Sequence, residues 1–325
     1  MLLPTLEDIK AARERVQRLV RRTPLMRHPL LCQETGLEIF VKHENHNPTG
    51  SFKIRGGLNL VDALSAEERR GVILATTGNH GQSVALACQR QGIPCTIVVP
   101  TRNNPDKNAA MRALGANLIE FGRDFDEARE RAEEMHKQSG LRYIHSANEP
   151  MLIAGVATYA LEIFNELSDP DVILVPIGGG TGACGCAIVR SALGLKTKII
   201  GVQTERADVF ARSWHGGVRL TGHQADTFAD GMATRVTYDL TFGILAAELD
   251  DVVTLSEAEL AEGVRLAIRT THNLAEGAGA ASLMAAKKMS DAFLGKKVVA
   301  VMTGANIDTG TLRKILQEPP PAARE

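Results

Sequence analysis

The sequence predicts an α/β protein with two open, twisted sheets that are flanked by helices. Short apolar stretches alternate with helical stretches twice along the chain, within residues 72–138 and again within residues 153–302. Such alternation is typical of β-α-β units, which build parallel sheets. We therefore expect a small mobile unit at residues 71–148, inserted into a large unit made of residues 1–70 and 149–325. Ligands of proteins with this organisation bind in the cleft between the units.

The elements of the first half follow from periodicity and turn residues. A helix is expected over residues 5–20, where apolar residues recur at helical spacing and Thr5 and Asp8 form a capping-box pattern. A strand over residues 38–43 leads into a polar stretch, and the next helix is expected over residues 53–64. In the small unit we expect strands at residues 72–76, 95–99 and 117–121, and helices at residues 83–91, 107–114 and 125–138.

The second half continues the alternation in the large unit. The expected helices are residues 153–167, 183–193 and 257–273, and the expected buried strands are residues 172–177, 198–203 and 297–302. The final residues, 318–325, are rich in proline and are expected to fray.

The composition is that of an ordinary globular protein, with 44% hydrophobic and 23% charged residues. A formal net charge of −1 gives no electrostatic basis for binding nucleic acid or an anionic membrane. No apolar run approaches the roughly 20 residues of a membrane helix, and the charged start is unlike a signal peptide. None of the five cysteines forms a Cys-x-x-Cys pair, so we expect reduced thiols and a cytoplasmic location.

The strongest local signal is the glycine cluster at residues 178–182, Gly-Gly-Gly-Thr-Gly, between a predicted strand and a predicted helix. Backbone N–H groups and a helix N-terminus converge there as in an anion-binding nest. The lysine of a P-loop and the acidic partner of a dinucleotide fingerprint are both missing, so a single phosphate fits better than a nucleotide. The alternative is a glycine turn that only permits tight packing.

Three further features lie at predicted strand ends or among small residues. The loop Thr76-Thr77-Gly78-Asn79-His80 suits a carboxylate, although a polar capping loop is the alternative. Thr303 follows the last predicted strand and can face the same cleft. Glu276 lies among small residues, which implies the close approach of another group; an acid placed at a helix N-terminus by the dipole explains it equally well.

Lys53 closes the stretch 47–53, Asn-Pro-Thr-Gly-Ser-Phe-Lys, in which Thr49 and Ser51 could cap the helix that follows. The helix dipole and the neighbouring Phe52 disfavour the charged form of Lys53, which makes it a candidate nucleophile. A solvated surface lysine is the ordinary alternative. A lysine, a phosphate nest, a carboxylate loop and a neutral hydroxyl together indicate pyridoxal phosphate.

These motifs resemble those of the serine/threonine dehydratase group of fold-type II pyridoxal-phosphate enzymes, which bind the cofactor in the interdomain cleft. Residues 47–56 resemble the cofactor-lysine motif, residues 77–82 the asparagine loop, residues 178–182 the phosphate cup, and residues 303–306 the segment at the cofactor nitrogen. The resemblance spans about residues 5–316. Four motifs in family order make it specific for the fold and the cofactor.

The resemblance implies a role for each matched position. Lys53 would hold the cofactor as a Schiff base and then remove the Cα proton. Thr77 is the second catalytic candidate, because it occupies the position of the serine acid of serine racemases. The other cofactor contacts would be Phe52, Asn79, Gly178, Gly179, Gly180, Thr181, Gly182, Gly231, Glu276 and Thr303, and the substrate contacts would be Thr76, Thr77, Asn79 and His80.

The implied place of Thr303 has a chemical consequence. A neutral hydroxyl does not protonate the pyridine ring, so the ring is a weaker electron sink and a long-lived carbanion is disfavoured. We expect β-elimination from threonine, serine or a 3-hydroxyaspartate-like amino acid, giving a 2-oxo acid and ammonia. Alternatives are a serine or aspartate racemase, for which the γ-methyl group of Thr77 is unfavourable, and a non-catalytic metabolite-binding protein. Breakdown of a hydroxylated, osmolyte-derived amino acid is also open.

Other positions bear on metals, regulation and partners. Gln203 and Val209 stand where metal-activated relatives carry acidic ligands, so no divalent-metal site is expected. The chain ends soon after residue 316, so no C-terminal regulatory domain is expected. Arg206, Arg212 and Arg235 could bind a second substrate carboxylate, although surface positions are the ordinary alternative. The expected partners are a small-molecule amino-acid substrate and, by resemblance only, a second copy of the chain in a homodimer.

Overall fold

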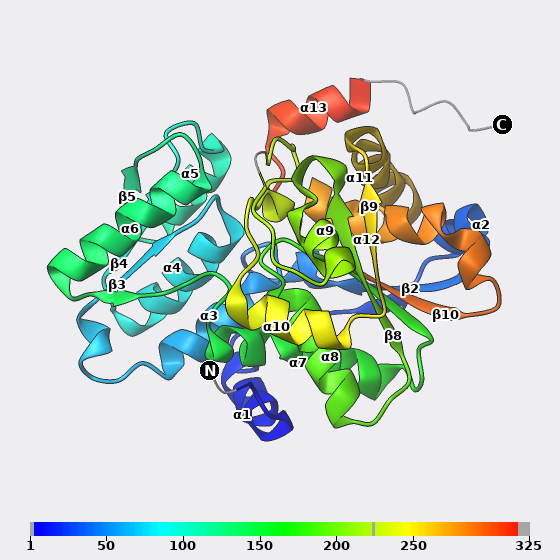
Figure 1. Ribbon diagram of the computed structural model, residues 1–325, viewed down its shortest axis with the longest axis horizontal. Helices are drawn as coiled ribbons and strands as arrows, with labels where there is room; N and C mark the ends of the chain where they lie inside the picture. Colours follow the sequence, from blue (N-terminus) through cyan, green and yellow to red (C-terminus); the bar gives the residue numbers. More distant parts are fainter. Residues whose placement is uncertain (1–2, 223–224, 318–325) are drawn as a thin grey trace.

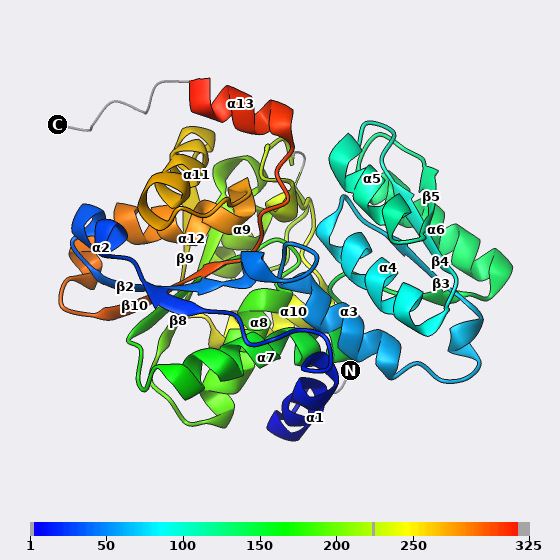
Figure 2. The same ribbon diagram turned by 180° about the vertical axis from the view of Figure 1, so that it is seen from behind.

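The computed structural model describes residues 3–222 and 225–317, and its ribbon is shown from opposite sides in Figures 1 and 2. These residues contain one six-stranded and one four-stranded sheet. The larger sheet has the strand order β1-β2-β10-β7-β8-β9, and all its pairs are parallel except β1 with β2. Its strands are β1 (Leu25–Arg27), β2 (Glu38–His43), β7 (Val172–Pro176), β8 (Lys198–Thr204), β9 (Asp251–Leu255) and β10 (Lys297–Met302).

Helices cover both faces of the larger sheet (Figure 1). Along β10, Val299 and Val301 pack into one core while Val298 and Ala300 pack into the other. This alternation explains why the central strands read as continuous apolar runs. The first core also contains residues of α1 (Leu6–Val16), α7 (Pro150–Glu166), α8 (Thr181–Ala192), α9 (Val209–Gly216) and α10 (Asp239–Glu248). The second contains residues of α2 (Pro29–Thr35), α11 (Glu257–Thr271), α12 (Gly277–Lys288) and α13 (Thr309–Gln317).

The smaller sheet is wholly parallel, with the order β5-β4-β3-β6. Its strands are β3 (Val72–Ala75), β4 (Cys95–Val99), β5 (Asn117–Glu120) and β6 (Arg142–Tyr143). Helices α3 (Lys53–Asp62), α4 (Asn79–Gln91) and α5 (Pro105–Ala113) pack on one face, and α6 (Phe125–Ser139) packs on the other. All four strands fall within residues 72–143, and α3, which lies before residue 71, also packs against this sheet.

The elements differ from the sequence predictions mainly in short helices and strands that the prediction left out. Strands β2, β4 and β10 have the predicted bounds, and the Thr5–Asp8 capping box is present. Helix α1 ends at Val16 rather than at residue 20, and α4 begins four residues before the predicted start. The prediction missed β1, β6, β9, α2, α9, α10, α12 and α13. The predicted fraying of residues 318–325 lies outside the described residues.

Within the described ranges, 3–222 and 225–317, we find no helix with the length and apolar character needed to cross a membrane.

Candidate active site

A pocket lies between the two sheets and opens to solvent; its outline encloses about 850 Å³, part of which is open solvent. Its walls come from the loops after β3, β7 and β10, that is, from the carboxyl ends of strands in both sheets. This is where open α/β sheets bind ligands. The pocket brings together all of the predicted site residues, namely Phe52, Lys53, Thr76, Thr77, Asn79, His80, Gly178, Gly179, Gly180, Thr181, Gly182, Gly231, Glu276 and Thr303.

Lys53 is the first residue of α3 and reaches the pocket floor. Its Nζ donates to Thr181 Oγ1 at 3.0 Å and lies 4.8 Å from the centre of the Phe52 ring. Burial disfavours the charged amine and lowers the pKa of Lys53 to about 8. The pKa of Lys53 is therefore shifted in the expected direction, which makes the neutral amine more accessible, and desolvation is the main cause.

The predicted caps of this helix are wrong. Phe52 is the N-cap residue and makes no side-chain capping bond. Thr49 Oγ1 and Ser51 Oγ are buried and have no hydrogen-bond partner among the described residues. The segment is held through its backbone instead, because Phe52 N donates to Thr303 O at 3.0 Å and Ala305 N donates to Gly50 O at 2.9 Å.

The glycine loop forms a cradle whose shape excludes side chains. A Cβ on Gly178 would lie 2.1 Å from the Gly231 carbonyl oxygen, and Gly180 has a φ of +88°, which favours glycine. Helix α8 begins directly after it, at Thr181. The first N–H groups of this helix lack partners within the helix, so they and the dipole favour an anion.

The loop before α4 is shaped by its own side chains. Thr76 Oγ1 accepts from Gly78 N at 3.0 Å, so this hydroxyl also holds the loop. His80 is buried, and its Nε2 has no partner in the described part of the chain. Burial and the nearby Lys53 charge lower the pKa of His80 to about 3, so the ring is neutral at physiological pH. Thr77 lines the same wall.

The Glu276 carboxylate points into the pocket although the residue occupies the N-cap position of α12, where it makes no capping bond. Glu276 Oε1 accepts from Asn79 Nδ2 at 2.5 Å, and Asn79 Oδ1 accepts from Asn306 Nδ2 at 2.7 Å. The Asn79 amide keeps one N–H free for a ligand oxygen. Burial raises the pKa of Glu276.

Sequence reasoning missed the ion pair that closes this wall. Lys107 Nζ, from the smaller-sheet side, donates to both Asp230 oxygens at 2.8 and 2.7 Å and to Glu276 Oε2 at 3.2 Å. Burial opposes the charge of Lys107, but the two carboxylates raise its pKa overall. The sequence offered one hint of this ion pair: Asp230 stands next to Gly231, which was predicted as a cofactor contact. Other lining residues that were missed are Phe125, Ser146, Pro176, Ala233, Thr234, Tyr238 and Ala278.

The three arginines considered for a second carboxylate do not line the pocket. Arg206 pairs with Asp226 at 3.2 Å and Arg212 with Asp208 at 2.9 Å. Arg235 pairs with Asp124 and Asp126 of the smaller-sheet side.

At the positions considered for a divalent metal, Gln203 is buried and its Oε1 accepts from Ala211 N at 2.9 Å. Val209 is also buried, as the first residue of α9.

The residues present fit pyridoxal phosphate. A primary amine with a lowered pKa faces a glycine cradle at a helix N-terminus, and the cradle has no room for side chains at Gly178. His80 Nε2 and Thr234 Oγ1 are buried polar atoms at the pocket that lack partners among residues 3–222 and 225–317. Such atoms are expected to bond to a ligand.

Comparisons with known proteins agree with this fit. Residues 16–304 match the family model described as pyridoxal-phosphate dependent enzyme. The chain is 40% identical over 315 residues to an L-threonine ammonia-lyase of Thermotoga maritima, covering 97% of this chain and 78% of that protein. It is 32% identical over 313 residues to a beta-hydroxyaspartate dehydratase of Paracoccus denitrificans, covering 96% and 99%. The solved structure of processed threonine deaminase isoform 2 from Solanum lycopersicum has a TM-score of 0.90 at 34% identity, covering 95% and 91%.

Proposed function

The chain belongs to the family of pyridoxal-phosphate-dependent enzymes, and we propose that its preferred substrates are threonine and serine. It is an ammonia-lyase of the dehydratase type, which converts a β-hydroxy amino acid into a 2-oxo acid and ammonia. The bound cofactor supplies an electron sink for the Cα carbanion. The fold of the chain is that of the serine/threonine dehydratase group.

We assign the roles of the pocket residues from their positions. The glycine cradle and the first turn of α8 would bind the phosphate, and the neutral hydroxyl of Thr303 would serve the ring nitrogen without protonating it. Lys53 would hold the cofactor covalently, and once released its amine, in the neutral form that burial favours, would take the Cα proton at Nζ. The first turn of α4, with Thr76, Thr77 and His80, orients the substrate carboxylate.

The observation that carries the substrate preference is the charge of the pocket wall. Besides Lys53, Lys107 is the one Lys or Arg lining the pocket among the described residues, and its three hydrogen bonds go to Asp230 and Glu276. We propose that the β-substituent lies toward this wall, where a second carboxylate would meet Asp230 and Glu276 without a free lysine or arginine among the described residues. Like-charge contacts of this kind cost several kcal/mol. The methyl group of threonine and the hydrogen of serine meet no such penalty.

A substrate panel tests this preference. We expect kcat/KM for 3-hydroxyaspartate to be at least about tenfold below that for threonine and serine. Asp230→Asn should reduce the difference in kcat/KM between the two kinds of substrate, because it removes one negative charge. Asp226 lies outside the pocket, so Asp226→Asn should leave that difference unchanged. Equal or better use of 3-hydroxyaspartate by the parent enzyme would refute the preference. Chiral analysis of unreacted serine in the same assays measures any racemase activity that Thr77 supports.

The division into units, the assembly and the location are also proposals. Residues 71–148 form a small unit that moves against residues 1–70 and 149–325, which is supported by the separate smaller sheet. The chain acts as a homodimer in the cytoplasm, and its five free cysteines are consistent with a reducing compartment. Light scattering of the purified protein at several concentrations tests the assembly.

A further inference from the structure

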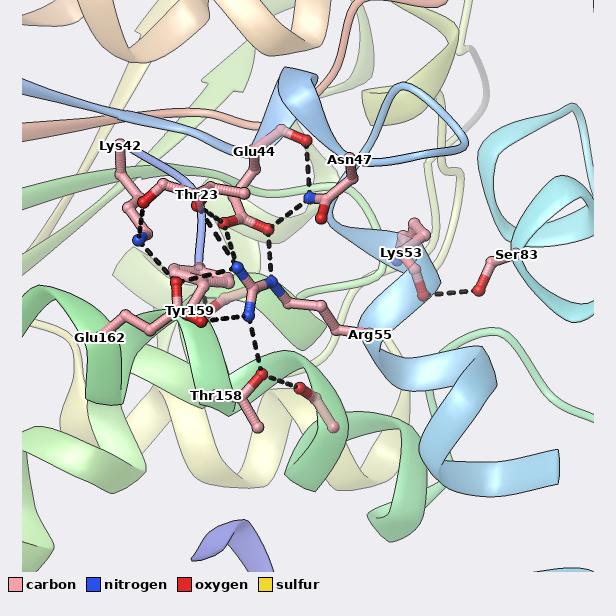
Figure 3. A network of polar contacts seen from close by, with 12 residues as sticks. Thr23, Lys42, Glu44, Asn47, Lys53, Arg55, Ser83, Thr158, Tyr159 and Glu162 are labelled. Atoms are coloured by element: carbon pink, nitrogen blue, oxygen red, sulfur yellow. Dashed lines mark hydrogen bonds and ion pairs between the residues drawn. The ribbon is translucent and has the colours of Figure 1, made fainter. Parts of the chain in front are cut away.

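A cluster of four charged side chains lies in the core beside the pocket. We name it the Arg55 cluster; it consists of Lys42, Glu44, Arg55 and Glu162 (Figure 3). Each of the four residues is at most 5% exposed. They come from β2, from the turn that follows β2, from α3 and from α7.

The hydrogen bonds of the cluster centre on one guanidinium. Arg55 Nε and Nη2 donate to the two Glu44 oxygens at 2.7 and 2.9 Å, and Nη1 and Nη2 donate to the two Glu162 oxygens at 2.7 and 2.9 Å. Lys42 Nζ donates to Glu162 Oε2 at 2.7 Å. Within the cluster two cations therefore face two carboxylates. Lys42 Nζ also lies 3.8 Å from the partly exposed Glu166, which pairs with Arg22, so the charge remains balanced.

Neutral groups complete the cluster. Thr23 Oγ1 donates to Glu44 Oε1 at 2.6 Å, and Asn47 Nδ2 donates to Glu44 Oε2 at 2.8 Å. Thr158 Oγ1 accepts from Arg55 Nη1 at 3.2 Å. None of the four charged residues has a side-chain polar atom left without a partner in the described residues.

Fold stability alone is a weak reason for such a cluster. Removing four charges from water costs free energy that their mutual attraction offsets only when the geometry is good, and apolar residues of similar volume are often as stable. Apolar side chains make no directional hydrogen bonds, so they do not fix how two segments are oriented relative to each other. A guanidinium fixed by two carboxylates on different segments sets the relative position of those segments.

The segments that the cluster fixes are the two that flank Lys53. Glu44 and Asn47 precede the lysine in the chain, and Arg55 follows it by two residues. Two helical residues turn the side-chain direction by about 200°. Arg55 therefore points toward Glu44 and Glu162 (Figure 3), while Lys53 Nζ donates to Thr181 Oγ1 at the pocket. On the other side, Ser83 Oγ donates to the Lys53 carbonyl oxygen at 2.6 Å.

We propose that the Arg55 cluster positions Lys53, fixing the start of α3 so that the amine stays dehydrated and aimed into the pocket. Arg55 is thus a positioning residue and does not touch the reacting atoms. The proposal deepens the proposed function, on which its relevance to turnover rests. A lysine at position 55 cannot replace the guanidinium, because one ammonium cannot bind two carboxylates through paired, coplanar donors.

The test compares Arg55→Lys with Arg190→Lys. Arg190 also bridges two carboxylates, Glu248 at 2.8 Å and Asp250 at 3.2 Å, but it lies near the far end of α8 from the pocket. The first readout is competitive labelling of cofactor-free protein with acetic anhydride between pH 6 and pH 11, in which peptide mass spectrometry follows Lys53. The second is kcat and KM of the holoenzyme with threonine.

For Arg55→Lys we expect the labelling midpoint of Lys53 to move by about one pH unit or more toward that of an ordinary lysine. We also expect kcat to fall at least about tenfold, because displaced catalytic groups lose rate steeply, with KM changed less than about threefold. Arg190→Lys should leave the labelling profile of Lys53 unchanged. A folded Arg55→Lys protein with the parent labelling profile would overturn the proposal.

If Arg55→Lys does not fold, Thr158→Val takes its place. This variant removes one acceptor of Arg55 and keeps the side-chain shape, so we expect a smaller shift of the labelling midpoint in the same direction. An unchanged profile overturns the proposal. Because the labelling uses cofactor-free protein, it tests the positioning of Lys53 even if the parent releases no ammonia, an outcome that would contradict only the proposed function.

Discussion

The Arg55 cluster, at the start of α3, and the contacts of Lys107, in the pocket wall, are two ionic clusters that are built differently. The Arg55 cluster joins β2 and α7 of the larger-sheet side to α3, and its two cations face two carboxylates. Glu166, which lies 3.8 Å from Lys42 Nζ, is itself paired with Arg22, so the charges remain balanced. The second, which we name the Lys107 cluster, consists of Lys107, Asp230 and Glu276 and joins the two sheets with one cation for two carboxylates. The Asp230 side chain also retains 30% exposure.

This difference indicates different purposes. A balanced cluster with every donor and acceptor occupied has one low-energy arrangement, which suits a fixed frame. A cluster with excess negative charge, partly open to water, loses less when it separates. We therefore expect the Lys107 cluster to open and close with the proposed motion of the small unit, while the Arg55 cluster stays intact.

The largest expected effect is that of removing the guanidinium of the Arg55 cluster. Arg55→Met leaves Glu44 and Glu162 buried with one cation between them, and should lower the free energy of unfolding by about 3–5 kcal/mol. Urea unfolding of cofactor-free protein measures this change. A loss below about 1 kcal/mol would mean that the carboxylates find other partners and that the frame is not rigid.

Replacing the central cation of the Lys107 cluster by methionine should lower the free energy of unfolding by less. After Lys107→Met, Asp230 can regain water and Glu276 keeps its bond to Asn79, so we expect a loss of about 1–3 kcal/mol. KM for threonine should rise, since the link between the two sheets is lost. A destabilisation equal to that of Arg55→Met would remove the distinction between the clusters.

The two clusters should also respond to acid with opposite signs. Burial opposes the charge of Glu44, but Arg55 more than offsets it and holds the pKa of Glu44 below its usual value, so its stabilisation is present above the unfolded pKa and is lost as the pH falls through the lowered one. Burial raises the pKa of Glu276, so its contribution is fully present below its unfolded pKa and is lost as the pH rises through the raised one.

Unfolding measured from pH 7 to well below the ordinary carboxyl pKa of about 4.3 checks these signs. The difference in free energy of unfolding between the parent and Glu44→Gln should shrink as the pH falls, because the parent then loses the stabilisation that the variant lacks. The cost of Glu276→Gln should grow over the same interval. Parallel curves for the two variants would contradict the assigned charge states.

The smallest effect is expected for Arg235→Gln, which breaks a second link between the sheets. Its bonds to Asp124 and Asp126 are partly exposed, with 33% of the Arg235 side chain accessible. Exposed pairs contribute about 0–1 kcal/mol, and less in high salt. A larger loss of stability that 1 M salt does not reduce would mean that Arg235 belongs to a rigid, buried cluster like the Arg55 cluster, and not to an exposed link that separates when the small unit moves.

The sequence predicted those parts of the molecule that depend on local pattern. Strands β2, β4 and β10 are short apolar runs with clear ends, and their bounds are right. Helix α12 was missed because its first ten residues contain two glycines and many alanines and are nearly all buried, so no polar face marks a helical period.

The pocket residues were recognised by motif, whereas the ionic clusters were not. Lys107 and Asp230 are 123 residues apart in the chain, and Arg55 and Glu162 are 107 apart. Nothing local distinguishes these residues from surface charges, because only the packing of the two sheets and of α3 against α7 makes them partners. The failed cap prediction at Thr49 and Ser51 has a similar origin, since contacts with residues 303–305 hold that segment.

The central claim is that Lys53 carries pyridoxal phosphate. Purified protein is reduced with borohydride and digested, and the modified peptide is identified by mass spectrometry, with Lys53→Ala as the control. The account predicts the reduced cofactor on Lys53 of the parent, no modification at that position in the variant, and loss of threonine turnover with the fold retained. An unmodified Lys53, or a Lys53→Ala protein that releases ammonia at the parent rate, would contradict it.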